Sequence, residues 1–194
     1  SVVREPLRRD PLRIAAVQAD VSLADKWVDA RIDSTKIPYT RYTEAAAEQG
    51  AQLVVWAETA IPAYIRIDKP LLNWARHLVR RAGVHLFTGF TDFERHVGHE
   101  ILKYNASGLF DPAGDLVDQY AKHHLLPIGE AMPFTWLIPQ LARIDVGQAE
   151  WTPGPPPRPL TVHTDKGQFR FAALICFESI FSRLARHGVR EGAQ

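Results

Sequence analysis

The sequence predicts an α/β domain, because short apolar runs of strand length alternate with segments of helical spacing. The apolar runs are residues 13–21, 51–58 and 84–90, and the helical segments between them are residues 34–49 and 71–83. Continuous apolar runs of this length are typical of strands buried on both faces of a sheet. Each helical segment ends at a glycine, Gly50 or Gly83, which is a common stop for a helix.

The second half of the chain has a different pattern. Residues 104–124 hold two strand-like runs on either side of Asp-Pro-Ala-Gly, a turn sequence, and therefore predict a β-hairpin. Residues 125–159 carry many prolines and predict a long loop. Residues 168–177 then predict one more strand, and residues 179–192 predict a helix that stops near Gly188 or Gly192.

Length and composition limit the kinds of protein this can be. The 194 residues suffice for one domain with a sizeable core, which we expect over residues 13–194, after a charged, proline-interrupted linker at 1–12. A net charge of +1 gives no reason to expect a nucleic-acid partner. One cysteine excludes an internal disulfide and a multi-cysteine metal site. No apolar run is long enough to span a bilayer.

Three polar residues follow predicted strands, where open α/β sheets collect their reactive groups. They are Glu58, Lys122 and the single cysteine, Cys176. A thiol can act as a nucleophile, a carboxylate can take its proton, and an ammonium can stabilise the oxyanion of a tetrahedral intermediate. Together these groups would attack a carbonyl or nitrile carbon and form a covalent thioester or thioimidate.

Each of these residues also has a structural interpretation. A cysteine next to a strand is most often a small buried apolar residue. A glutamate such as Glu58 at a strand end, or a lysine such as Lys122, is commonly a solvated surface charge. His123 and His124 are adjacent and would point to opposite faces of a strand, so we interpret them as structural and not as metal ligands.

Three motifs together decide between these interpretations. VVWAETAIP at 54–62, YAKHHLLPIGEAMP at 120–133 and ALICFESIF at 173–181 resemble, in order and spacing, the Glu, Lys and Cys motifs of the nitrilase, or carbon-nitrogen hydrolase, superfamily. The individual residues within these motifs resemble those of the apolipoprotein N-acyltransferase branch. DKW at 25–27 is similar to an early Lys-Trp segment of that branch. The resemblance extends from Arg13 to about Ala193.

The resemblance implies a role for individual residues. Glu58 is expected to be the general base, Lys122 the oxyanion stabiliser and Cys176 the nucleophile. Glu130 matches a second glutamate that positions the lysine or the thiol, and Glu178 matches the glutamate that follows the Cys motif.

The resemblance also implies contacts with a lipid substrate. Trp27 matches a tryptophan near the lipid entrance of the branch. Phe177 stands where the branch usually has tyrosine, so the ring is kept and a hydroxyl is lost. Trp136 lies in a proline-rich loop, residues 131–151, that is rich in apolar residues and suits either a lid that touches lipid or packing over the domain's own core.

The implied fold is a four-layer α-β-β-α sandwich, in which further strands would follow Gln194 and membrane helices would precede Arg13. The chain is therefore expected to be a truncated catalytic domain, whose full-length protein lies at the periplasmic face of the bacterial inner membrane. The implied reaction moves an acyl chain from a phospholipid to the cysteine, and then to the free α-amine of a diacylglyceryl-cysteine on a lipoprotein. No metal or organic cofactor is implied.

Two other functions remain open from the sequence. A soluble amidase or nitrilase would use the same three residues, with water as the second nucleophile. A non-catalytic binding domain would keep the fold, although the presence of all three reactive residue types argues against it.

Overall fold

A computed structural model of the chain describes residues 11–20, 32–95, 101–127, 130 and 151–194. It contains one six-stranded mixed sheet and one two-stranded antiparallel sheet. The larger sheet has the order β1-β2-β4-β5-β6, with β3 also paired to β4. Its strands are β1 (Ile14–Val17), β2 (Leu53–Trp56), β3 (Ile61–Tyr64), β4 (His85–Arg95), β5 (Ile101–Phe110) and β6 (Leu116–Ala121). The smaller sheet pairs β7 (Leu160–Thr164) with β8 (Gly167–Phe171).

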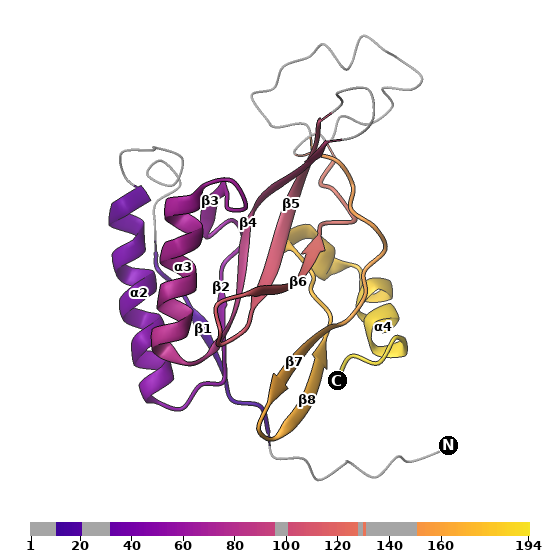
Figure 1. The fold of residues 1–194 in the computed structure, drawn as a ribbon. Helices are drawn as coiled ribbons and strands as arrows, with labels where there is room; N and C mark the ends of the chain where they lie inside the picture. The colour runs from indigo at the N-terminus through magenta and orange to yellow at the C-terminus, as the bar shows by residue number, and fades with distance from the viewer. Residues whose placement is uncertain (1–10, 21–31, 96–100, 128–129, 131–150) are drawn as a thin grey trace, which may run out of the picture.

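The elements form four layers, in agreement with the expected α-β-β-α order. Helices α2 (Ile32–Glu48) and α3 (Lys69–Ala82) cover one face of the larger sheet (Figure 1). The β7–β8 hairpin lies on the other side, followed by the 3₁₀ helix η3 (Cys176–Ile180) and the helix α4 (Ser182–Arg190). No helix within the described residues is long and apolar enough to cross a lipid bilayer.

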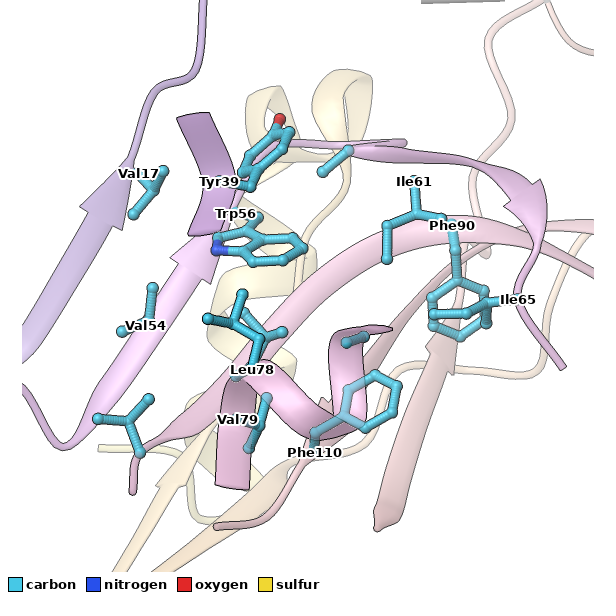
Figure 2. Packing of buried hydrophobic residues seen from close by; sticks show 14 of the residues in the cluster. Val17, Tyr39, Val54, Trp56, Ile61, Ile65, Leu78, Val79, Phe90 and Phe110 are labelled. Carbon is cyan, nitrogen blue, oxygen red and sulfur yellow. The ribbon is translucent and has the colours of Figure 1, made fainter. Parts of the chain in front are cut away.

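Side chains on β2 alternate between the two cores, as the pleat of a strand requires. Val54 and Trp56 enter the core under the helices, whereas Leu53 enters the core under the β7–β8 hairpin. Figure 2 shows the helix-side core, where Trp56 lies beside Tyr39 and near Leu78 and Val79. The Trp56 ring is 4.5 Å from that of Tyr39, and its indole N–H donates to Thr43 Oγ1 at 3.0 Å, so the polar atom of this buried ring has a partner.

The predicted helices and hairpin are present. Helix α3 begins where the Asp68 side chain accepts a hydrogen bond from the Leu71 backbone N–H, and it ends at Gly83, whose φ of 67° is left-handed. Strands β5 and β6 form the predicted hairpin around residues 111–115.

Other parts of the prediction are corrected by the structure. Strands β3 and β7 were not expected. The strand expected over residues 168–177 ends at Phe171, because only residues 167–171 pair with β7. Cys176 therefore lies beyond the sheet, as the first residue of η3. Of the two expected stops for the last helix, Gly188 lies inside α4, whereas Gly192 lies just beyond its end at Arg190.

Strands β2 and β3 pair one after the other with the same edge of β4, and this arrangement sets the position of Glu58. Strand β2 pairs with the first residues of β4, from His85 to Phe87, and β3 pairs with β4 at Phe90 and Thr91. Between the two strands the chain makes a turn over residues 57–60. The turn passes so close to Gly89 that a Cβ at that position would lie 2.4 Å from the Thr59 nitrogen. Only glycine allows this approach, which brings Glu58 against β4.

Phe90 on β4 is fully buried, and its ring packs directly against Gly108 on β5. Replacing the phenylalanine by a small residue therefore leaves a cavity. We expect Phe90→Ala to lower the free energy of unfolding by about 3–5 kcal/mol. The control Val117→Thr changes a residue on β6 that is 53% exposed and should alter stability by less than about 0.5 kcal/mol. Urea unfolding curves measure both, and equal effects would contradict the described core.

Candidate active site

Lys122 is a buried ammonium held by carboxylates. It follows β6 directly, and its side chain is 2% exposed. Its backbone N–H donates to Asn105 O at 2.8 Å, and its own carbonyl accepts from the Gly154 N–H at 2.7 Å. The ammonium lies 2.6 Å from a carboxylate oxygen of Glu130 and 3.8 Å from one of Glu58. Since a buried lysine charge is costly without partners, these two carboxylates account for its position.

Asn105 joins the two carboxylates, and sequence reasoning did not single it out. Its Nδ2 donates to Glu58 Oε1 at 2.7 Å and to Glu130 Oε1 at 3.0 Å. One amide group thus bridges two negative side chains that would otherwise repel each other. The available signal was a polar residue inside the buried half of β5, in YNASGLF, because a buried amide normally has specific partners.

Glu130 is ionised and fixed. Burial alone would raise its pKa, but the hydrogen bonds from Lys122, from the Leu126 N–H and from Asn105 outweigh burial and lower the pKa below its ordinary value of 4.5. Its second oxygen accepts from the Leu126 backbone N–H at 2.9 Å. Glu58 has more contact with solvent, with 35% of its side chain exposed against 14% for Glu130. The two carboxylates are thus chemically distinct, one structural partner and one accessible group.

Cys176 is exposed, which argues against the interpretation as a buried core residue. Its φ of 50° is unusual for a residue other than glycine, and its carbonyl accepts a hydrogen bond from Ser179 Oγ at 2.7 Å. Thr59, next to Glu58, also has a positive φ, of 45°. Strained backbone of this kind is concentrated at functional sites, where neighbouring contacts hold it in place.

Glu178 supplies such contacts and ties the cysteine segment to the lysine segment. It is completely buried, and its carboxylate accepts four hydrogen bonds. One oxygen accepts from Tyr120 Oη at 2.7 Å and from the backbone N–H groups of His123 at 2.9 Å and His124 at 3.0 Å. The other accepts from the Ile175 N–H at 2.8 Å. Residues 120–124 and 175–178 are thereby joined through one side chain.

The burial of Tyr120 and its hydrogen bond to Glu178 together keep the phenol protonated. Burial raises the pKa of Tyr120, and the neighbouring carboxylate raises it further. The phenol is therefore a permanent donor to Glu178 at any physiological pH.

Of the three residues expected to contact the lipid, the structure describes only Phe177. Phe177 is half-buried, and its ring packs edge-on against that of Phe181 at 5.0 Å. Trp27 and Trp136 lie outside the described residues. Within the described ranges, no group of three or more His, Cys, Asp or Glu side chains is arranged to hold a metal ion.

Removing the charge of Glu178 should destabilise the fold strongly. Glu178→Gln keeps the shape but replaces one acceptor oxygen by a donor amide, which leaves buried N–H groups without a charged partner. We expect the free energy of unfolding to fall by about 2–4 kcal/mol. Glu48→Gln, at an exposed position on α2, is the matched control and should change it by less than about 0.5 kcal/mol. A loss under about 1 kcal/mol for Glu178→Gln would show that the four bonds are dispensable.

Glu130 should make stability depend on pH in a defined direction. Because folding lowers its pKa, its contribution is present above the unfolded value of about 4.5 and is lost as the pH falls through the folded value. The stability difference between the wild-type chain and Glu130→Gln should thus be largest near pH 7 and shrink between pH 5 and pH 3. Chemical unfolding at each pH measures it, with Val117→Thr, which changes no titratable group, as the control. A difference that grows on acidification would contradict this assignment.

Comparisons with known proteins agree with the geometry. The chain matches the carbon-nitrogen hydrolase family model over residues 13–194. It is 34% identical to a protein named apolipoprotein N-acyltransferase from Chlorobaculum tepidum, over 94% of this chain and 38% of that protein. It is 31% identical to one of the same name from Geobacter metallireducens, over 95% of this chain and 34% of that protein. The chain thus spans little more than a third of the length of these relatives.

Solved structures share the fold. A mutant of the amidase from Nesterenkonia sp. AN1, with acrylamide added at its active-site cysteine, superposes with a TM-score of 0.63 at 18% identity, covering 95% of this chain and 65% of that one. The carbon-nitrogen hydrolase from Helicobacter pylori G27 has a TM-score of 0.63 at 16% identity, covering 94% and 57%. At these identities the likeness concerns the fold alone. With the family match over nearly its whole length, the chain belongs to the carbon-nitrogen hydrolase family.

Proposed function

We propose that this chain is the catalytic domain of an apolipoprotein N-acyltransferase. The observation that supports this most is an exposed Cys176 of strained backbone, whose segment Glu178 ties to residues 120–124. In that second segment the Lys122 ammonium contacts two carboxylates. The names of the curated relatives support the choice of acyl transfer over hydrolysis. The proposed donor is a phospholipid, and the proposed acceptor is the free α-amine of a diacylglyceryl-cysteine on a lipoprotein.

In the first half-reaction Cys176 takes the acyl chain. Its sulfur attacks the carbonyl carbon of the phospholipid ester while Glu58 accepts the thiol proton. The carbonyl oxygen becomes an oxyanion, which the Lys122 ammonium stabilises. When the intermediate collapses, the ester C–O bond breaks, the leaving alkoxide takes the proton from Glu58, and a lysophospholipid departs. The acyl chain remains on Cys176 as a thioester.

In the second half-reaction the acceptor amine attacks the thioester carbon. Glu58 takes a proton from the amine, the same ammonium stabilises the second oxyanion, and the C–S bond breaks. The departing sulfur recovers a proton from Glu58, so the free thiol and the free carboxylate are regenerated. An amide now links the acyl chain to the acceptor.

The two carboxylates have separate roles in this scheme. Glu130, with its lowered pKa and three donors, holds the Lys122 ammonium in place. Glu58 is farther from the ammonium and partly exposed, which suits a group that must gain and lose a proton in each half-reaction. Asn105 holds both at fixed positions and is a positioning residue.

The resemblance to the branch supplies further parts of the proposal. The full-length protein would lie at the periplasmic face of the bacterial inner membrane, with Trp27 and Trp136 in contact with the acyl chains.

The first half-reaction can be tested by measuring the mass of the protein before and after it takes up an acyl chain. On incubation of the chain with phospholipid in detergent micelles, intact-protein mass spectrometry should show one acyl adduct that neutral hydroxylamine removes. Cys176→Ala should show none, and Glu58→Gln should slow its appearance by about 10²–10⁴-fold. The control Glu48→Gln, at an exposed position on α2, should react as the wild-type chain does.

The second half-reaction separates transferase from hydrolase. A peptide with a free amine on its S-diacylglyceryl-cysteine should remove the adduct, whereas the same peptide with an acetylated amine should not. Release of ammonia from small amides, with no acyl adduct from phospholipid, would instead favour an amidase and overturn the proposal.

A further inference from the structure

The segment that follows Cys176 carries exposed positive charge. Arg183, Arg186 and Arg190 are all exposed on α4. Between residues 179 and 194 the sequence has one acidic residue, Glu191, against these three arginines. Helix α3 is also rich in basic residues, so the number of arginines alone does not distinguish α4.

The arginines of α4 lack the carboxylate partners that several arginines elsewhere in the fold have. On α3, Arg76 and Arg81 form ion pairs with Asp115 and Glu44. On α4, in the part of the chain that the structure describes, the partners are neutral or absent. They are His124 and the Phe181 ring for Arg183, and the Ser182 hydroxyl for Arg186, while Arg190 has no ion-pair partner among the described residues.

The contact between Arg183 and His124 leaves the arginine charge uncompensated. A guanidinium N–H of Arg183 lies 2.7 Å from His124 Nε2, and because the guanidinium only donates, the imidazole nitrogen accepts. Burial lowers the pKa of His124, and the neighbouring His123 and Arg183 lower it further, so the ring is neutral. The contact therefore orients Arg183 without cancelling its charge.

Exposed apolar side chains lie among these charges. Ile180, at the end of η3, is 67% exposed, and Val189 on α4 is 64% exposed. Ile180 is four residues from the exposed Cys176 and three from Arg183. Helix α4 is on the opposite side of the larger sheet from α2 and α3 (Figure 1). Arginine interleaved with exposed aliphatic residues suits the interface of an anionic bilayer, where guanidinium groups meet phosphates and aliphatic side chains reach the acyl boundary.

We propose that η3 and α4 form a docking surface for an anionic phospholipid bilayer, with Ile180, Arg183, Arg186, Val189 and Arg190 as its contact residues. This rests on the proposed function, in which the acyl donor is a phospholipid, and it adds how the cysteine is brought to that donor. Docking would hold the exposed Cys176 toward the lipid surface. A second copy of the chain is a poorer partner, because a two-fold contact through α4 would bring arginines against arginines.

Vesicle co-sedimentation tests this surface separately from the acyl-transfer reaction. The probe is the Cys176→Ala chain, which cannot form the thioester, mixed with vesicles of phosphatidylglycerol and phosphatidylcholine or of phosphatidylcholine alone. We expect binding to the anionic vesicles only, weakened by salt. Arg186→Gln with Arg190→Gln removes two charges and leaves the His124 contact intact, and it should weaken binding about 25-fold, at roughly fivefold per arginine.

Matched variants distinguish this surface from general electrostatic attraction. Arg41→Gln with Lys69→Gln removes the same charge from exposed positions on α2 and α3 and should change binding by less than about twofold. Ile180→Ser should weaken binding to vesicles but not to heparin. Failure of the chain to bind anionic vesicles, an equal loss in the two double variants, or no effect of Ile180→Ser on vesicle binding would overturn the proposal.

The test is independent of the acyl-transfer test. If the wild-type chain forms the acyl adduct from micelles but does not bind vesicles, the docking surface is wrong and the proposed function stands. If it binds vesicles through α4 but forms no adduct, the surface stands and the proposed function fails.

Discussion

The burial of the Lys122 ammonium is the constraint on which the site depends. A lysine charge that is almost completely removed from water requires carboxylates close by, and Glu130 and Glu58 supply them at 2.6 Å and 3.8 Å. Those carboxylates come from segments far apart in the chain, so their convergence imposes further contacts. Asn105 must bridge them, and Gly89 must lack a side chain so that the turn at Glu58 can approach β4.

A second buried charge, that of Glu178, performs the corresponding task for the cysteine. Its four donors include two backbone N–H groups directly after Lys122 and one directly before Cys176. The side chains of the candidate site are therefore positioned by backbone contacts as well as by their own. The strained φ of Cys176 is compatible with this, because rigid neighbours on both sides of the residue can maintain it.

Local sequence patterns predicted most of the fold, since the helices α2 and α3, the strands β1, β2 and β4 and the β5–β6 hairpin follow from apolar periodicity and turn residues. Strand β3 was missed because it contains Pro62, and β7 was missed because it follows the proline-rich PGPPPRP. The strand expected to reach Phe177 stops at Phe171, because an apolar run does not show where a pairing partner ends.

The residues of the candidate site could be predicted from the sequence, but the residues that hold them in position could not. Glu58, Lys122 and Glu130 do lie together, and family resemblance also pointed to Glu178. Asn105, Gly89 and Gly154 were not expected, since each acts through a contact with a segment remote in sequence. A Cβ on Gly154, for example, would lie 2.3 Å from the carbonyl oxygen of Ala121, which no local pattern reveals.

The position of Glu178 also has a consequence for the order in which the site is assembled during synthesis. Residues 58–130, with both carboxylates and the ammonium, leave the ribosome well before residues 175–178. Cys176 is thus synthesised almost together with Glu178, the carboxylate that anchors its segment. It is synthesised after Glu58, the group proposed to accept its proton. A nascent chain can therefore bring its charged cluster together before Cys176 has been synthesised, so the cysteine is added to the proposed site as a late step.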